Sequence, residues 1–244
     1  AYEQHERLVG AEMRRRGRNT TSRGRTLRFL YDGPHDEFKA ALYKLGQTPL
    51  PEYIKREPEE SDVTDYQAIY ATREGAVVAP GAGLHFSREL MKRIEIKGIK
   101  QGFITVHSGL GNFREIDVED LTKHRMDSEE LIVGEQLVDM VNAAKDADKQ
   151  VCAVGTSVLR GISSTVSMGG HMKTYTGWTN KFIFPPYDFT VTTSMVSNFH
   201  LPYSTMLMMV AAFGGYDNVM KAYNDATEKG YRFGGYGDSL LIVD

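Results

Sequence analysis

The most continuous apolar pattern of the chain lies between residues 177 and 215 and predicts the centre of the core. Residues 182–184 and 191–196 are rich in aromatic or β-branched side chains and are bounded by turn residues, which is typical of strands. Pro202 favours the start of a helix, and residues 206–213 have almost no polar face. A helix without a polar face must be buried, so this segment is expected to lie at the centre of the fold.

Residues 34–244 alternate between helical and strand patterns, which predicts an α/β domain with a layered sheet and flanking helices. Amphipathic or capped helical patterns begin near residues 36, 62, 88, 137, 156 and 219. Further strands are expected at residues 77–79, 103–107, 151–154 and 239–243.

Residues 1–33 differ from the rest of the chain and are expected to form a separate arginine-rich β-hairpin. Residues 8–13 and 26–31 alternate loosely, like two strands, and seven arginines fall between residues 13 and 33. One interpretation is a solvated loop at the tip of the hairpin. The other is a tip that contacts phosphates, because guanidinium groups match phosphate oxygens.

Composition narrows the class of protein. The 244 residues are 41% hydrophobic with a formal net charge of -3, so nucleic acid could bind only through a local basic patch. The single cysteine, Cys152, lies in an apolar run and is expected to be buried, in a reducing, cytoplasmic setting. Neither a membrane-spanning run nor a signal peptide is visible. The first residue is alanine, which suggests that part of the natural N-terminus is absent.

Polar side chains recur where predicted strands end, and several of them adjoin glycines that allow close backbone approach to a ligand. The residues concerned are His85, His107, Arg114, Arg160, Asn198, His200 and Asp238. Each could instead be a hydrogen-bonded structural residue. Gly155-Thr156-Ser157 follows a strand and opens a helix, which is a plausible pocket for a carboxylate or other anion.

Two common kinds of site do not fit the sequence. The seven histidines and one cysteine include no close ligand pair of the CxxC or HExxH type, which disfavours a zinc site. Ser108 follows His107, but the chain contains no GxSxG nucleophile elbow, which disfavours a serine hydrolase.

Six segments occur together in an order that resembles one enzyme family. They are PGAGLHFSRELM, ITVHSGLGNFREI with HRMDSE, VGTSVLRGISS, GWTNKFIFPPYDF, SNFHLPYSTMLMMVAAF and YRFGGYGDSLLI. From about Arg25 to its C-terminus the chain resembles the S-adenosylmethionine:tRNA ribosyltransferase-isomerases of the queuosine pathway. The resemblance implies that the ribosyl part of S-adenosylmethionine moves to the aminomethyl-7-deazaguanine wobble base of tRNA. The products would be epoxyqueuosine, adenine and methionine.

The resemblance also implies roles for individual residues. A base must remove a proton from the carbon beside the sulfonium, and an acid must assist adenine departure. The matching histidines are His85, His107 and His200, with His107 or His200 as the base. Arg114 or Arg160 would hold the methionine carboxylate. Further substrate-binding candidates are Thr156, Asn198, Trp178, Tyr187 and Asp238, of which Trp178, Tyr187 and Asp238 suit a sulfonium.

The resemblance implies a cytoplasmic, monomeric enzyme that uses S-adenosylmethionine and tRNA, without a metal or a membrane. The family has a further N-terminal segment and most of a β-barrel before the matching part, so residues 1–33 are expected to be a barrel remnant beside a catalytic domain at residues 34–244. Ser108, Asn112, Glu115 and Ser163 depart from the family pattern. The alternatives are a catalytically silent relative that binds tRNA or nucleotide, and a methyltransferase, whose glycine-rich signature is absent.

Overall fold

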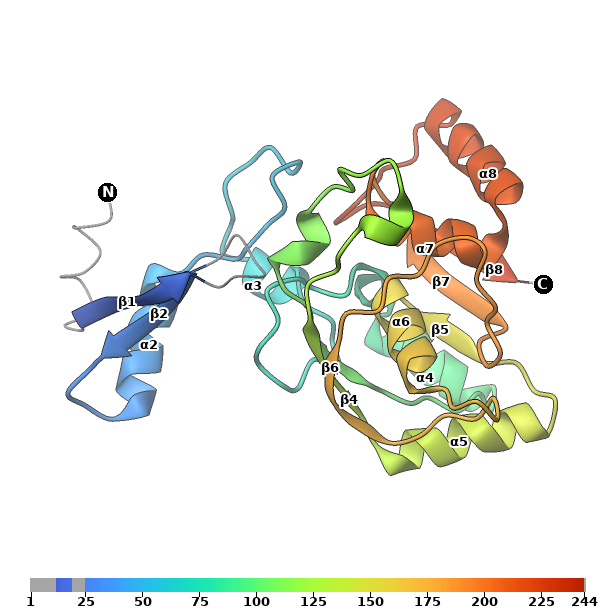
Figure 1. Ribbon diagram of the computed structural model, residues 1–244, viewed down its shortest axis with the longest axis horizontal. Coiled ribbons are helices and arrows are strands. Elements are labelled where there is room, and N and C mark those ends of the chain that lie inside the picture. Colours follow the sequence, from blue (N-terminus) through green and yellow to red (C-terminus); the bar gives the residue numbers. More distant parts are fainter. Residues whose placement is uncertain (1–11, 19–24, 244) are drawn as a thin grey trace. The chain divides into compact units, whose positions relative to one another are not determined.

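The computed structural model describes residues 12–18 and 25–243 (Figure 1). The chain divides into two compact units, Ala1–Thr48 and Pro49–Asp244. The structure is mixed α/β, as the alternation of helical and strand patterns predicts.

The first unit contains a hairpin and a helix. Strands β1 (Glu12–Arg18) and β2 (Arg25–Leu30) pair antiparallel, with an irregularity in register between Arg16 and Arg18. Helix α2 (His35–Leu45) follows, and the N–H of Gly46 closes its last turn on the carbonyl of Leu42. The ring of Phe38 packs against Phe29 and Tyr31, which joins helix to hairpin. Of the expected first strand, residues 8–11 lie outside the described residues, as do residues 19–24 of the arginine-rich tip.

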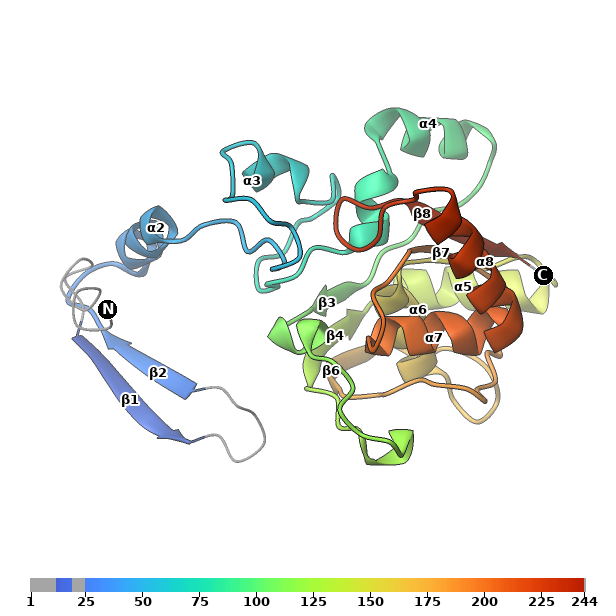
Figure 2. The ribbon, with the colours of Figure 1, turned by 90° about the horizontal axis from the view of Figure 1, so that it is seen from above.

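The strands of the second unit form two three-stranded sheets (Figure 2). The first sheet has the antiparallel order β3 (Thr105–His107), β4 (Glu129–Val133) and β6 (Tyr175–Thr179). The second has the order β5 (Cys152–Val154), β7 (Ser194–Asn198) and β8 (Ser239–Val243). Strand β7 pairs parallel with β5 and antiparallel with β8.

Helices of the second unit surround and connect these sheets. They are α3 (Asp62–Asp65), η1 (Gly81–His85), α4 (Arg88–Ile96), η2 (Leu110–Phe113), η3 (Leu121–Lys123), α5 (Glu135–Asp146), α6 (Thr156–Thr165), α7 (Thr205–Gly214) and α8 (Tyr216–Glu228). Helix α6 contacts β3, β4 and β6 of one sheet and β5 of the other, as well as α7. Among the described residues, no helix has the length and apolar character needed to cross a membrane.

The hydrophobic core of the second unit lies between these sheets and helices. Its fully buried large side chains come from both sheets, from α6 and α7 and from the segment before β7: Leu131, Leu159, Ile183, Met195 and Val210. Helix α7, which has almost no polar face, is therefore buried as its sequence requires. Ser204 caps it by accepting a hydrogen bond from the N–H of Leu207 at 3.1 Å, so the helix begins after Ser204 rather than at Pro202.

Three local expectations were wrong. Residues 182–184 form no strand, because no described strand pairs with them. Ile183 is nevertheless fully buried, and the rings of Phe182 and Phe184 pack against each other. Residues 77–79 are irregular and lead into the short helix η1. Cys152 is exposed rather than buried, because the alternation of β5 turns Ala153, and not Cys152, into the core.

Candidate active site

The end of β7 is hydrogen-bonded to the loop that carries Tyr236-Gly237-Asp238, called the YGD loop below. The side-chain amide of Asn198 donates to the carbonyl of Gly234 at 3.1 Å, and the N–H of Gly234 donates to the carbonyl of Phe199 at 2.7 Å. The N–H of Phe199 donates to the carbonyl of Asp238 at 3.3 Å. Two segments that the sequence separates by more than thirty residues therefore form one corner.

Two further segments reach the same region. The N–H of Ile116 donates to the carbonyl of Tyr203 at 2.8 Å, which ties the loop after η2 to the chain that follows His200. The N–H of Val77 donates to the carbonyl of Ser108 at 2.8 Å, which ties the approach to η1 to the end of β3. Helix η1 in turn contacts β7. The ends of β3 and β7 are thus linked through residues 75–85 and 109–116.

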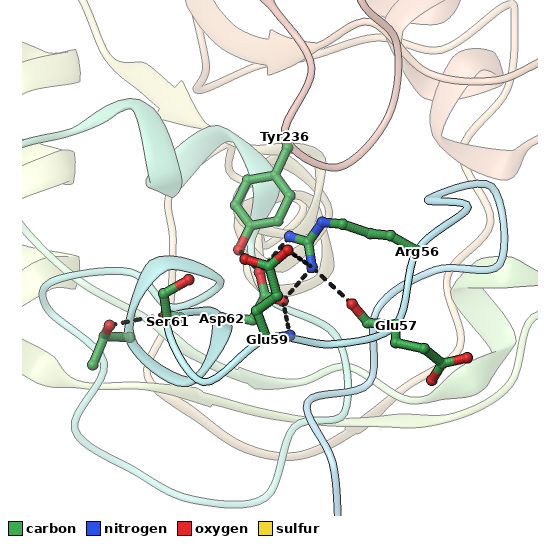
Figure 3. Close-up of polar contacts among 7 residues, drawn as sticks. Arg56, Glu57, Glu59, Ser61, Asp62 and Tyr236 are labelled. Carbon is green, nitrogen blue, oxygen red and sulfur yellow. Dashed lines mark hydrogen bonds and ion pairs between the residues drawn. The ribbon is translucent and has the colours of Figure 1, made fainter.

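A polar cluster around Asp62 holds the YGD loop from its other side (Figure 3). The guanidinium of Arg56 donates to both carboxylate oxygens of Asp62, at 2.6 and 2.7 Å, and the hydroxyl of Tyr236 donates at 2.7 Å. The backbone N–H of Glu59 donates a further bond at 2.8 Å. These donors, Arg56 first among them, hold the pKa of the Asp62 carboxyl well below its usual range, and the hydrogen bond to Asp62 in turn raises the pKa of Arg56. Tyr236 has a φ of 55°, an uncommon value that the cluster helps to maintain.

His107 forms a pair with a carboxylate. Its Nδ1 lies 3.0 Å from Oε2 of Glu130 on the neighbouring strand β4. Its Nε2 is buried and has no hydrogen-bond partner among the described residues. Gly75 lies against the ring, since a Cβ there would stand 2.5 Å from Nδ1. One nitrogen of His107 is therefore paired with a carboxylate, and the other has no partner within the part of the chain that the structure describes.

Trp178 lies on the same face of the sheet as this pair. It is directly opposite Glu130 in the register of β4 and β6, as His107 is in the register of β3 and β4. Its side chain is 66% exposed, whereas large aromatic residues in a sheet are more often covered. An exposed indole beside a histidine and a carboxylate can stack on a base or a cation.

His85 and Asn198 each present an unsatisfied polar atom near the joined strand ends. Nε2 of His85 and Oδ1 of Asn198 are buried and have no hydrogen-bond partner among the described residues. Gly81 lies beside the Asn198 amide, since a Cβ there would stand 3.3 Å from Oδ1. Thr156 begins α6 close by, because Gly155 approaches Ala82 of η1. The structure thus brings His85, Asn198 and Thr156 into one neighbourhood.

Arg160 is committed to an ion pair with Glu129. The two side chains are only 3% and 4% exposed, and burial lowers the pKa of Arg160 to about 10, so it remains charged at neutral pH. Oε1 of Glu129 also accepts from the side-chain amide of Asn112 at 2.6 Å and from the N–H of Gly109 at 3.1 Å. This network fixes the loop that follows His107.

Arg114 is more accessible than Arg160. Its guanidinium donates to Oδ1 of Asp127 at 3.1 Å, and the two side chains are 38% and 30% exposed. Because the guanidinium has further N–H groups and reaches solvent, Arg114 can bind an additional carboxylate.

His200 has a different environment from His107. Its Nε2 lies 2.8 Å from the hydroxyl of Ser197, and its backbone N–H donates to the hydroxyl of Tyr223 at 3.0 Å. Burial of the imidazole lowers the pKa of His200 to about 4, so the ring is neutral at neutral pH. Its neighbour Phe199 belongs to the core and packs on Tyr223 and Phe233.

Tyr187 and Asp238 occupy other surroundings. Tyr187 accepts a hydrogen bond from Lys181 at 3.1 Å and lines a cavity of about 200 Å³ beside the C-terminal half of α6. It therefore lies towards the opposite end of α6 from Thr156. The carboxylate of Asp238 accepts from the backbone N–H of Arg232 at 2.7 Å, within its own loop.

The sequence reasoning missed the two carboxylates that organise this region. Glu129 and Glu130 are neighbours in β4, and the alternation of a strand sends one side chain to buried Arg160 and the other to His107. The available signal was a second glutamate, Glu130, directly after the glutamate that ends the HRMDSE motif. Among residues 12–18 and 25–243, no group of three or more histidine, cysteine, aspartate or glutamate side chains could hold a metal ion.

Comparisons with known proteins agree on one family. A family model described as "Queuosine biosynthesis protein" matches residues 3–242. A protein of Bacteroides fragilis named "S-adenosylmethionine:tRNA ribosyltransferase-isomerase" is 70% identical over 93% of this chain and 64% of its own length. The protein of that name from Parabacteroides distasonis is 68% identical over 92% of this chain and 64% of its own length.

A solved structure also matches. The S-adenosylmethionine tRNA ribosyltransferase from Thermotoga maritima is 34% identical, with a TM-score of 0.56 over 67% of this chain and 52% of its own. The chain spans 64% of the length of the two curated relatives above.

Proposed function

Because the chain belongs to the queuosine biosynthesis protein family, we propose that it transfers and isomerises the ribosyl moiety of S-adenosylmethionine onto tRNA. The acceptor is the aminomethyl group of the 7-deazaguanine at the wobble position, and the products are epoxyqueuosine, adenine and methionine. The observation that carries the proposal is 70% identity, over 93% of the chain, to a relative with that activity in its name.

The sulfonium donor is the substrate that these side chains suit. An exposed indole such as Trp178 attracts a sulfonium through its ring face. Arg114 is the better candidate for the methionine carboxylate. Arg160 is buried and paired with Glu129, and through that pair it supports the loop that follows His107. The unsatisfied polar atoms of His85 and Asn198, close to Thr156, are available to the ribose or the adenine. Asp238 is proposed to bind the substrate from the loop that carries it, whereas Tyr187, which lines the cavity at the opposite end of α6, stands apart from this site.

Proton abstraction requires a base whose lone pair is not already engaged in a hydrogen bond, and two histidines compete for this role. His107 offers an Nε2 atom that has no partner among the described residues. His200 has its Nε2 beside Ser197, and a pKa of about 4 makes its imidazole a weak base. We therefore favour His107 as the base and His200 as a neutral hydrogen-bonding group near the departing adenine.

The arginine-rich hairpin is proposed to approach the tRNA backbone. Register places Arg14 opposite Arg28, and arginines that neighbour one another across a hairpin suit phosphate oxygens. We interpret residues 1–33 as the remnant of a small β-barrel and residues 34–244 as the catalytic domain. The boundary between the two compact units follows Thr48, so helix α2 belongs to the same unit as the hairpin. The protein is further proposed to be cytoplasmic and monomeric, and sedimentation analysis would test the monomeric state.

A second candidate function is a catalytically silent relative that binds tRNA or nucleotide. Ser108, Asn112, Glu115 and Ser163, which depart from the family pattern, favour it.

One assay separates these functions. The chain is incubated with S-adenosylmethionine and tRNA that carries the precursor base, and adenine release is followed. Adenine from the unaltered chain supports the proposal, tRNA binding without adenine supports the silent relative, and S-adenosylhomocysteine would indicate a methyltransferase. His107→Ala and His200→Ala are then compared, and full turnover in both variants removes the histidines from the mechanism.

A further inference from the structure

The partner of His107 determines which of its two nitrogens can act. A neutral imidazole carries one proton, and a hydrogen bond made by one nitrogen fixes the tautomer. Oε2 of Glu130 lies 3.0 Å from Nδ1. An ionised carboxylate can only accept, so a neutral imidazole paired with it through Nδ1 carries its proton on Nδ1 and its lone pair on Nε2.

Three observations describe the surroundings of Nε2, and the first of them points to a ligand there. The atom is buried and lacks a hydrogen-bond partner among the described residues, although buried polar atoms are normally paired. The backbone of Gly75 packs against the imidazole ring and restricts how the ring can turn. The φ of Gly75 is 142°, a value that residues with a side chain rarely adopt. Trp178 presents an exposed indole on the same face of the sheet, in register with Glu130.

We propose that Glu130 is a positioning residue that holds His107 with Nδ1 protonated, so that Nε2 is the atom that removes the proton beside the sulfonium. This inference rests on the proposed function and assigns a role to a residue outside the histidines and arginines. In the step itself, the C–H bond next to sulfur breaks and its electron pair stays on carbon. The proton forms an N–H bond at Nε2, and the resulting imidazolium is stabilised by the Glu130 carboxylate through Nδ1–H.

The adjacent carboxylate provides an internal contrast. Glu129 points to the opposite face of β4, is 4% exposed and pairs with Arg160, whereas Glu130 is 37% exposed and pairs with His107. Removal of Glu130 therefore leaves the buried ion pair intact. The partial exposure of Glu130 also means that a small carboxylate from solvent can enter the space it vacates.

The test uses Glu130→Ala, with Glu228→Ala as a control that removes an exposed glutamate of α8. Imidazole ¹⁵N NMR, assigned by comparison with His107→Ala, reports the tautomer, and adenine release reports kcat and KM. We expect His107 to show protonated Nδ1 in the unaltered chain and a mixture of tautomers in Glu130→Ala. We expect kcat to fall about tenfold or more, with KM for S-adenosylmethionine within about twofold. Formate should restore part of kcat in Glu130→Ala and change nothing in Glu228→Ala.

Each outcome decides the proposal. An unchanged His107 tautomer in Glu130→Ala overturns it, and so does a loss of activity that formate does not relieve, since that would be a structural role. If Glu130→Ala is unfolded, Glu130→Gln replaces it, and its amide, which can donate or accept, is expected to give mixed tautomers. If the unaltered chain releases no adenine, the proposed function fails, while the tautomer measurement still decides whether Glu130 positions His107.

Discussion

Arg160 and Glu129 form an ion pair in which neither side chain is more than 4% exposed. The pair joins the first turns of α6 to β4 and, through Asn112 and Gly109, to the loop after His107. Breaking a buried pair leaves one charge without a partner, which costs far more than losing a surface pair.

Arg160→Met is therefore expected to lower the free energy of unfolding by about 3–5 kcal/mol. Arg232→Met is the matched control, because Arg232 is 77% exposed and lies 4.0 Å from Asp238, where a loss below about 1 kcal/mol is expected. Urea denaturation of the three proteins measures the difference. Equal midpoints for both variants would show that the buried pair contributes nothing to stability.

The cluster around Asp62 should make the stability of the folded protein depend on pH in the acidic range. The pKa of Asp62 is lowered by Arg56 and its other donors, so its contribution is present above the ordinary carboxyl value of 3.8 and is lost as pH falls towards the depressed folded value. Asp62→Asn should lower the melting temperature by several degrees at pH 7, and the gap to the unaltered chain should narrow below pH 3.8. Asp225→Asn, which breaks the exposed pair with Lys229, should change little. A gap that stays constant with pH would contradict the assignment.

His200 should destabilise the protein in mild acid. Its folded pKa of about 4 lies below the ordinary value of 6.5, so between these values the unfolded chain binds a proton that the folded chain does not. Stability attributable to this residue therefore falls as pH drops from 6.5 to 4, by roughly 3 kcal/mol in total. Urea denaturation at pH 7.5 and pH 4.5 should show a smaller loss in His200→Gln than in the unaltered chain. The same loss in both proteins would rule out this source.

Trp178 offers a direct report of donor binding. It is the single tryptophan of the chain and is 66% exposed, so its fluorescence should change when a sulfonium nucleoside covers the indole. Titration with S-adenosylmethionine should give a saturable change in emission. Trp178→Ala should weaken binding by about tenfold in calorimetry, with Trp178→Phe in between and no loss of folding cooperativity. Unchanged affinity in Trp178→Ala would place the donor elsewhere.

Gly75 should be intolerant of a side chain because of His107. A Cβ at Gly75 would meet Nδ1 of His107 at 2.5 Å, and its φ of 142° disfavours any other residue. Gly98 is the matched control, since it also has a positive φ of 76° but meets nothing within 4 Å. Gly98→Ala should cost roughly 1–2 kcal/mol of backbone strain alone. Gly75→Ala should cost more in urea denaturation and should also shift the imidazole NMR signals of His107, whereas Gly98→Ala should leave them in place.

The local pattern of residues determined much of this protein. The apolar run of α7 and the last strand are set by neighbours in the chain, so the periodicity of apolar residues predicts them. The ordered motifs indicated the family for the same reason, because a motif is a local string. Histidines and arginines at strand ends could likewise be selected as candidates before any contact was known.

Only the tertiary structure decided which of these groups meet. Nothing local distinguishes Glu129 from Glu130, yet strand alternation and pairing give one to a buried guanidinium and the other to a histidine. Asp62 and Tyr236 are 174 residues apart, and Cys152 is exposed although its neighbours are apolar. Such partnerships depend on the register of strands and on how distant segments close over the core, and these are properties of the whole chain rather than of any short stretch of it.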